Sequence, residues 1–180
     1  MMMQRIWNKL KKRLLLIVII LQVLFLTVMA GLNYVVEEFG DIIYLETEPY
    51  DPRDVFYGDY VHLNYPIEEI FPSYWFGSEK VKRNKVINVL LKPDERGIYK
   101  VKAASDKSLD PNEDEVVIRA RYLYKDHDNV RHVTYGLNRY YIEEGTGEEF
   151  DTVNQKMIVT VALSPWGQKK ILEVDELEQQ

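Results

Sequence analysis

The chain has 180 residues, a net charge of −6 at pH 7 and no cysteine. That length gives room for one modest domain, and the missing cysteine excludes disulfides, a thiolate nucleophile, a lipid-modified cysteine and cysteine-ligated metal sites. Beyond the N-terminal region, 18 basic side chains stand against 29 acidic ones, a balance that would repel nucleic acid and anionic lipid headgroups. We therefore expect no nucleic-acid partner.

The first feature along the chain is an uncharged apolar segment at 14–32. At about 1.5 Å per residue its length roughly matches the ~30 Å hydrocarbon core of a bilayer. No face of the segment is polar, whereas a helix on the surface of a soluble domain would have one polar face. The sequence therefore predicts a transmembrane helix, with the lipid bilayer as its partner.

The charges on either side of this segment predict its orientation. Five cations and no acidic residue precede it, while acidic residues follow it closely, so the positive-inside rule places the N-terminus in the cytoplasm. We expect a cytoplasmic tail at 1–13, a signal-anchor helix at 14–32 in the cell membrane, and an extracytoplasmic domain at 33–180. Cleavage after Ala30 is the alternative, but the apolar run exceeds the 7–15 residues usual for a signal core.

Short β-type runs separated by polar turns dominate the rest of the chain. The runs are 41–49, 60–65, 86–92, 98–103, 115–124, 130–136, 156–163 and 168–174. Pro93 with Gly97, and Pro165 with Gly167, suit two of the tight turns, and Pro66 opens the one short helical turn expected. The pattern predicts an all-β fold, mainly antiparallel, built as a sandwich or a partly closed barrel after the single transmembrane helix.

The run at 60–65 alternates between two faces. Leu63 and Tyr65, together with Val61, are apolar enough for the core, whereas Tyr60 and His62 point toward water or a shallow groove. The residues before this strand are expected to form a turn that leads into it, and they are Asp51, Pro52, Arg53, Asp54, Gly58 and Asp59. In that turn, Arg53 is expected to bridge a neighbouring aspartate.

The segment "FPSYWFG" at 71–77 gathers four aromatic side chains. Such a segment can stack on sugars, enter a membrane interface or contact a protein partner. We expect Phe71, Trp75 and Phe76 to cover one end of the core. If they are exposed instead, they form the best candidate interaction surface in the chain.

Serine–lysine catalysis has little support in the sequence. An anchored β-domain outside the membrane resembles the layout of a type I signal peptidase, which uses a serine activated by a lysine. Here Ser78 with Lys80, and Ser105 with Lys107, have the wrong spacing for a dyad on one helix face and lie in no recognisable motif. A cell-envelope hydrolase that uses carboxylates or an unrecognised serine stays open as the alternative function.

Metal sites have equally little support. The acidic segment at 110–114 begins like a calcium loop, but Glu115 and Arg121 occupy the positions that an EF-hand reserves for glycine and glutamate. The segment at 126–129 lies where a hairpin turn is expected. We therefore predict no catalytic, metal-binding or cofactor-binding residue.

The string "GDYVHLNY" at 58–65 resembles the signature of the bacterial GDYXXLXY family of membrane-anchored proteins of unknown function. Its named positions are filled by Gly58, Asp59, Tyr60, Leu63 and Tyr65. The lead-in "EPYDPRDVFYGDY" is similar to the family as well. So is "YGLNRYYIEEGTGEEF" at 135–150, in which the matching residues are Arg139, Tyr140, Glu144, Gly145 and Gly147. Glu143 replaces a proline that is common in the family.

The resemblance implies a small membrane-associated protein, often encoded beside a polytopic membrane protein, and it implies no catalytic residue or cofactor. We therefore expect an accessory or interaction module of an envelope membrane complex. The candidate interaction surface consists of Tyr60, His62, Phe71, Tyr74, Trp75, Phe76, Arg139, Tyr140 and Glu144.

Overall fold

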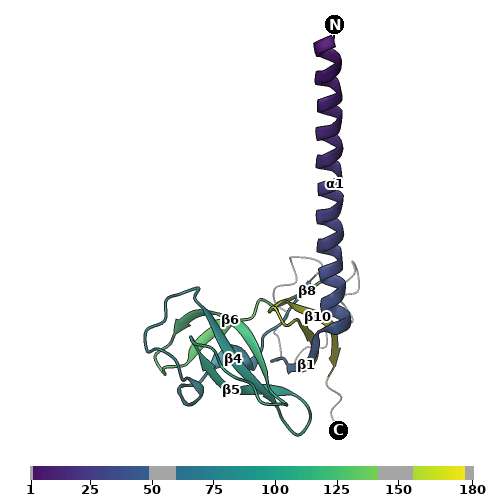
Figure 1. The fold of residues 1–180 in the computed structure, drawn as a ribbon. Coiled ribbons are helices and arrows are strands. Elements are labelled where there is room, and N and C mark those ends of the chain that lie inside the picture. Colours follow the sequence, from purple (N-terminus) through teal and green to yellow (C-terminus); the bar gives the residue numbers. More distant parts are fainter. Residues whose placement is uncertain (1, 49–59, 142–155, 177–180) are drawn as a thin grey trace. The chain divides into compact units, whose positions relative to one another are not determined.

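The structure is a computed structural model that describes residues 2–48, 60–141 and 156–176. The chain divides into two compact units, Met1–Phe39 and Gly40–Gln180. The first unit is the single helix α1, Met2–Phe39 (Figure 1). Its exposed stretch Lys11–Gly31 is long and apolar enough to cross a membrane, and it covers all but the last residue of the segment predicted at 14–32. The helix extends beyond that segment because residues 2–39 contain no proline and only one glycine.

The second unit is the β-domain, in which the described residues form ten strands and two short 3-10 helices. The strands are β1 (Asp41–Glu46), β2 (Tyr60–His62), β3 (Glu69–Ile70), β4 (Val86–Pro93), β5 (Tyr99–Ser105), β6 (Val116–Lys125), β7 (Arg131–Thr134), β8 (Arg139–Tyr141), β9 (Met157–Leu163) and β10 (Lys169–Glu176). The 3-10 helices are η1 (Pro66–Glu68) and η2 (Pro72–Tyr74). Strands are therefore the main secondary structure of the described residues after α1, as predicted.

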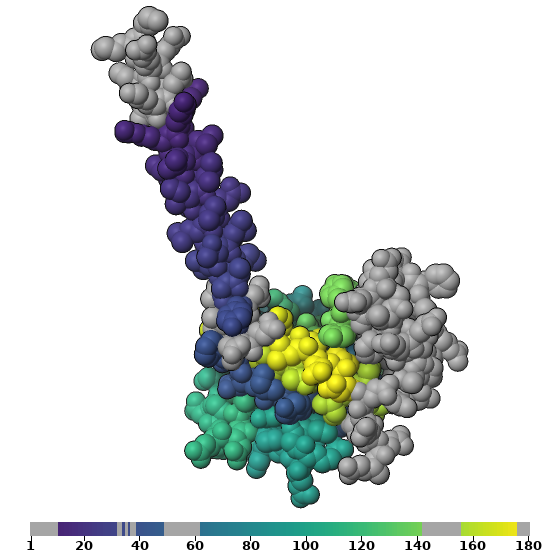
Figure 2. All heavy atoms as spheres, turned by 90° about the vertical axis from the view of Figure 1, so that its right-hand side faces the viewer, coloured from purple at the N-terminus to yellow at the C-terminus, as the bar shows by residue number. Residues whose placement is uncertain are grey.

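The strands form three antiparallel sheets with the orders β1-β9-β10, β2-β8 and β3-β7-β6-β4-β5. An isolated parallel bridge between Tyr44 and Ile98 joins β1 to the start of β5. In Figure 2, β1 (dark blue) accordingly lies between the yellow of β9 and β10 and the teal of the β4–β5 region. On the far side of β10, the Lys169 ammonium group donates to the carbonyls of Arg119, in β6, and Tyr135, after β7. The result is a nearly closed, barrel-like arrangement, which confirms the all-β prediction.

The core consists of the inward-facing residues of alternating strands. Ile43 and Leu45 of β1 are fully buried, and so are Val159 and Val161 of β9, to which β1 pairs. The same alternation buries Ile87 and Val89 in β4 and Ile118 and Ala120 in β6. Burial of every second residue is the physical reason that these runs could be recognised as strands.

Two local details differ from the prediction. The turn after β4 begins at Asp94 instead of Pro93, because the Asp94 carboxylate accepts the N–H groups of Arg96 and Ile98 at 2.9 and 3.0 Å. The strand expected at 60–65 ends at His62. Gly97 and Gly167 do close their turns as expected, with φ of 79° and 91°.

Candidate functional site

The strand pair β2–β8 joins two of the segments that resemble the GDYXXLXY signature. Its register places Tyr60 opposite Tyr141 and His62 opposite Arg139. The chain after β2 continues along the same partner, because the Leu63 N–H donates to the Asn138 carbonyl at 3.0 Å. Segments about 75 residues apart in the chain are thereby held side by side.

The predicted two-faced character of 60–65 is confirmed where the side chains are described. Leu63 and Tyr65 are buried, whereas His62 and Asn64 are only partly so. The Tyr65 hydroxyl donates to the Leu137 carbonyl at 3.0 Å, and burial raises the pKa of this phenol well above its ordinary value. Tyr65 is therefore a structural residue that fastens this strand to the segment leading into β8.

Strand β8 separates its three side chains between the core and the surface. Tyr140 packs against the core, while Arg139 and Tyr141 lie on the opposite, exposed face. Tyr141 is 70% exposed. The predicted turn residues Asp51, Pro52, Arg53, Asp54, Gly58 and Asp59, and the predicted contact residue Glu144, lie outside the described residues, so their roles stay predictions.

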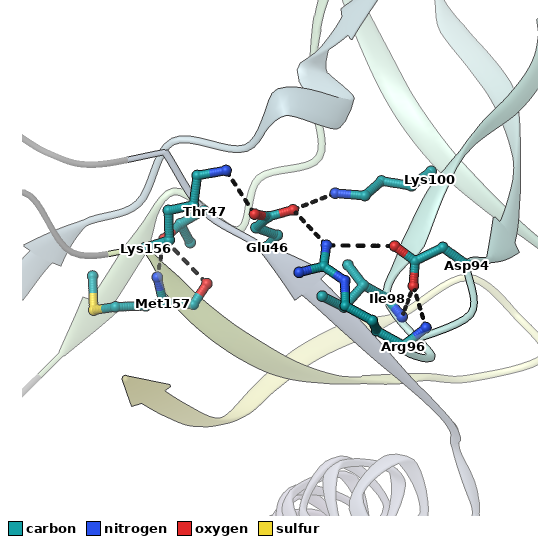
Figure 3. A network of polar contacts seen from close by, with 8 residues as sticks. All are labelled: Glu46, Thr47, Asp94, Arg96, Ile98, Lys100, Lys156 and Met157. Atoms are coloured by element: carbon teal, nitrogen blue, oxygen red, sulfur yellow. Dashed lines mark hydrogen bonds and ion pairs between the residues drawn. The ribbon is translucent and has the colours of Figure 1, made fainter. Parts of the chain in front are cut away.

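A buried carboxylate organises the neighbouring end of β1 (Figure 3). The Glu46 side chain is only 7% exposed and accepts hydrogen bonds from the amines of Lys100 and Lys156. A third cation, Arg96, lies 3.7 Å from it and also contacts Asp94. Burial alone would raise the pKa of Glu46, but the hydrogen bonds and charges of the two lysines lower it to about 2. Glu46 is thus ionised and ties β1 to β5 and to the start of β9.

The residue after Glu46 completes this connection. The Thr47 N–H donates to the Met157 carbonyl at 2.9 Å, and the Met157 N–H donates to the Thr47 hydroxyl oxygen at 3.1 Å (Figure 3). We call Glu46, Thr47, Lys156 and Met157 the clamp. In the sequence, residues 49–59 connect the end of the clamp strand to β2, and residues 142–155 connect β8 to the clamp. Both segments therefore have their two ends at the same two paired positions.

The second predicted surface is the aromatic loop, which we define as residues 71–85. Its backbone is attached to the sheet where the Phe76 N–H donates to the Ala104 carbonyl at 2.8 Å. The Trp75 ring packs against the core, its indole N–H donates to the Ser78 carbonyl, and the Arg131 guanidinium lies 4.5 Å from the ring centroid. Arg131 is itself buried. The indole therefore fixes one side of the loop against the β-domain.

Asp106 fixes the other side of the loop. Its carboxylate accepts the backbone N–H of Ser78 at 2.8 Å, the Ser78 hydroxyl at 2.9 Å and the Lys85 amine at 2.8 Å. The hydrogen bonds from Lys85 and Ser78 hold the pKa of this carboxyl well below its usual range. Gly77 lies between Trp75 and Asp106, where a Cβ atom on this residue would be 2.6 Å from Trp75 Cζ2. The backbone of this loop is thus closely constrained.

The side chains of the loop divide in a way that the sequence did not predict. Trp75 covers the core as expected, but Phe71 and Phe76 are 49% and 67% exposed, and Tyr74 is 40% exposed. The expectation that Phe71 and Phe76 cover the core is therefore wrong. The physical reason is that residues 70–71 and 75–76 are extended, so Phe71 and Phe76 each follow an inward side chain, Ile70 or Trp75, and point in the opposite direction.

A buried ionisable cluster was missed entirely by the sequence analysis. Burial raises the pKa of Glu68, whose carboxylate accepts the Tyr135 N–H at 3.1 Å. Burial, with the nearby charge of Arg121, lowers the pKa of Lys169 to about 8. The Tyr135 hydroxyl donates to the Ile67 carbonyl at 2.8 Å. Perturbed groups of this kind are found at functional sites and in structural networks alike. Here their hydrogen bonds go to backbone groups of η1, β6 and Tyr135 and, for Glu68, also to the Thr134 side chain.

The serine and metal candidates can be located in the structure. The Ser78 hydroxyl donates to Asp106, and the Ser105 hydroxyl accepts the Lys107 N–H, so within the described residues neither serine oxygen bonds to a lysine amine. Asp126 accepts two backbone N–H groups of its own turn and contacts His132 at 3.0 Å. No group of three His, Asp or Glu residues in the described part of the chain is placed to hold a metal ion. The hydrolase alternative stays a prediction.

An apolar helix followed by a nearly closed antiparallel β-domain places this chain among single-helix β-domain proteins. A profile of the family described as GDYXXLXY protein matches residues 22–174. The chain belongs to this family, as the resemblance around Gly58–Tyr65 indicated. Comparisons with curated proteins and with solved structures gave no match.

Proposed function

We propose that this protein is a membrane-anchored accessory module of the bacterial envelope. Residues 1–13 form its cytoplasmic tail, 14–32 cross the cell membrane, and 33–180 form the extracytoplasmic domain. The exposed apolar stretch of α1 supports the anchor, and the cations that precede it support the orientation. The family resemblance suggests a polytopic membrane protein as the partner.

The observation that carries the interaction function is the outer face of β8. Arg139 and Tyr141 are both exposed there, two positions apart on one strand face. Arginine and tyrosine are among the residue types that most often dominate the binding energy of protein interfaces. Because Tyr140 packs against the core between them, the two side chains are presented from a backbone that the fold holds in place.

The orientation can be tested with single cysteines, because the chain has none of its own. In intact cells a membrane-impermeant maleimide should label Ser108→Cys, at an exposed position of the β-domain, and leave Gln4→Cys unlabelled until the cells are permeabilised. The reverse pattern would show that the proposed orientation is wrong. The apparent mass of the labelled chain also reports whether the segment ending at Ala30 is retained.

The partner surface can be tested by site-specific crosslinking in membranes. A photo-reactive phenylalanine analogue in place of Tyr141 should crosslink the full chain to a polytopic membrane protein. The same analogue in place of Tyr124, an exposed tyrosine on β6, is the matched control and should give no such product. Arg139→Ala should reduce the Tyr141 crosslink. Equal crosslinking from both tyrosine positions, or from neither, would contradict a partner surface on β8.

A further inference from the structure

The aromatic loop carries a local charge opposite to that of the β-domain. Lys80, Lys82 and Arg83 are exposed. Glu79 within the loop and Asp106 beside it already have cationic partners, since Glu79 pairs with Lys125 and Arg131 and Asp106 pairs with Lys85. Three cations therefore lie a few residues after the exposed rings of Phe71, Tyr74 and Phe76 in the sequence, in a domain whose overall charge is strongly negative.

We propose that the aromatic loop binds anionic lipid headgroups at the surface of the membrane that α1 crosses. Aromatic rings favour the interface between hydrocarbon and water, and lysine or arginine near an anionic leaflet is attracted to it. This inference goes beyond the protein contact proposed for β8 and uses a different surface. It rests on α1 being inserted in the membrane.

The net charge of the domain does not oppose this contact. At about 0.1 M salt, charges separated by more than about 10 Å are largely screened. A headgroup against the loop therefore interacts with Lys80, Lys82 and Arg83 more than with acidic residues elsewhere on the domain. The expectation that the acidic domain is repelled by anionic lipid holds for its average surface and not for this loop.

Two structural features favour binding without a large ordering cost. The loop backbone is held by Asp106, Trp75 and the Phe76–Ala104 hydrogen bond before any lipid is present, so little conformational entropy is lost on binding. Only Gly40 separates α1 from β1, so the anchor keeps the domain at a high effective concentration beside the bilayer. A modest intrinsic affinity for headgroups is then sufficient.

The test uses the full chain in lipid nanodiscs. Ser73→Cys, at an exposed position of η2, is labelled with a dye whose emission shifts to the blue in an apolar surrounding. We expect a blue shift in discs that contain phosphatidylglycerol and none in discs of phosphatidylcholine alone, with the shift reversed by high salt. The same label at Glu95→Cys, in the β4–β5 turn, is the control and should report water in both discs. The same emission from Ser73→Cys in both discs would overturn the proposal.

Charge variants provide a second readout. Lys82→Gln with Arg83→Gln should weaken loop docking about 25-fold, because each cation near an anionic surface contributes about fivefold. Lys92→Gln with Arg121→Gln removes the same charges from exposed strand positions and should leave docking unchanged. Equal effects of the two pairs would overturn recognition by the loop. Co-elution with discs of either composition reports on α1, so a chain that fails to enter any disc overturns the anchor itself.

Discussion

Replacing Glu46 with glutamine should lower the free energy of unfolding at pH 7 by about 1–2 kcal/mol. The lowering of the Glu46 pKa from 4.5 to about 2 corresponds to about 3 kcal/mol of preferential stabilisation of the carboxylate. Because Lys100, Lys156 and Arg96 are each roughly half exposed, solvent screening reduces the net contribution. Chemical denaturation of the parent and the variant measures the difference.

The pH dependence of the unfolding free energy tests the role of Glu46 more directly than its value at pH 7. A carboxyl whose pKa is depressed in the folded state contributes its full stabilisation above its unfolded pKa and loses it as the pH falls through the folded value. The difference in unfolding free energy between parent and Glu46→Gln should therefore be constant above about pH 5 and shrink between pH 4.5 and 2. Glu95→Gln, an exposed residue in the β4–β5 turn, is the control and should show no such change. A difference independent of pH would contradict the clamp.

Replacing Gly77 with alanine should destabilise the β-domain by about 1–3 kcal/mol, the usual range for added atoms in a packed site. The new Cβ atom would lie 2.6 Å from Trp75 Cζ2, 2.7 Å from Asp106 Oδ1 and 2.9 Å from the Asp106 backbone nitrogen. The last of these is a backbone atom, so the collision is not relieved by rotation of a side chain. Thermal or chemical unfolding measures the loss.

The sign of the change in unfolding free energy for Gly77→Ala is informative. At positions that accept a Cβ atom, glycine-to-alanine changes stabilise a protein by about 0.4–1 kcal/mol, because they reduce the freedom of the unfolded chain. Ser108→Ala, at an exposed position, is the control and should be nearly neutral. Gly77→Ala should also abolish the blue shift of a label at residue 73, since Trp75 and Asp106 can no longer hold the loop. An equally or more stable variant that keeps the shift would show that this loop is not constrained by close packing.

The strands could be predicted from the sequence because their burial is local and periodic. Ile87 and Val89 alternate with the more exposed Val86 and Asn88 in β4, and Gly97 and Gly167 mark turns that need a positive φ. The short strands β3 and β8 were missed, since two or three residues carry no measurable period. Their existence depends on partners far along the chain, His132 and Arg131 for β3 and β2 for β8.

The polar clusters could not be predicted for a related reason. Glu46 meets Lys156 across 110 positions of sequence, and Glu68 meets Tyr135 across 67. Neither carboxylate has a neighbouring residue that distinguishes it from the other 27 acidic residues. The aromatic loop was different, because its residue types were recognisable in the sequence. Only the opposite directions of the Trp75 and Phe76 side chains depended on the bridge between Trp75 and Ala104 of β5.

The clamp and the β2–β8 pair also bear on how the length of this protein can vary. The entropy cost of closing a loop grows only with the logarithm of its length, by about 0.6 kcal/mol for each doubling. Segments 49–59 and 142–155 each begin and end at these paired positions. Residues inserted within either segment would therefore add little to the entropy cost of closing it, as long as both paired ends stay in place. The clamp and the β2–β8 pair would in that case keep Glu46 beside Lys156 and His62 opposite Arg139 whatever the length of chain between them.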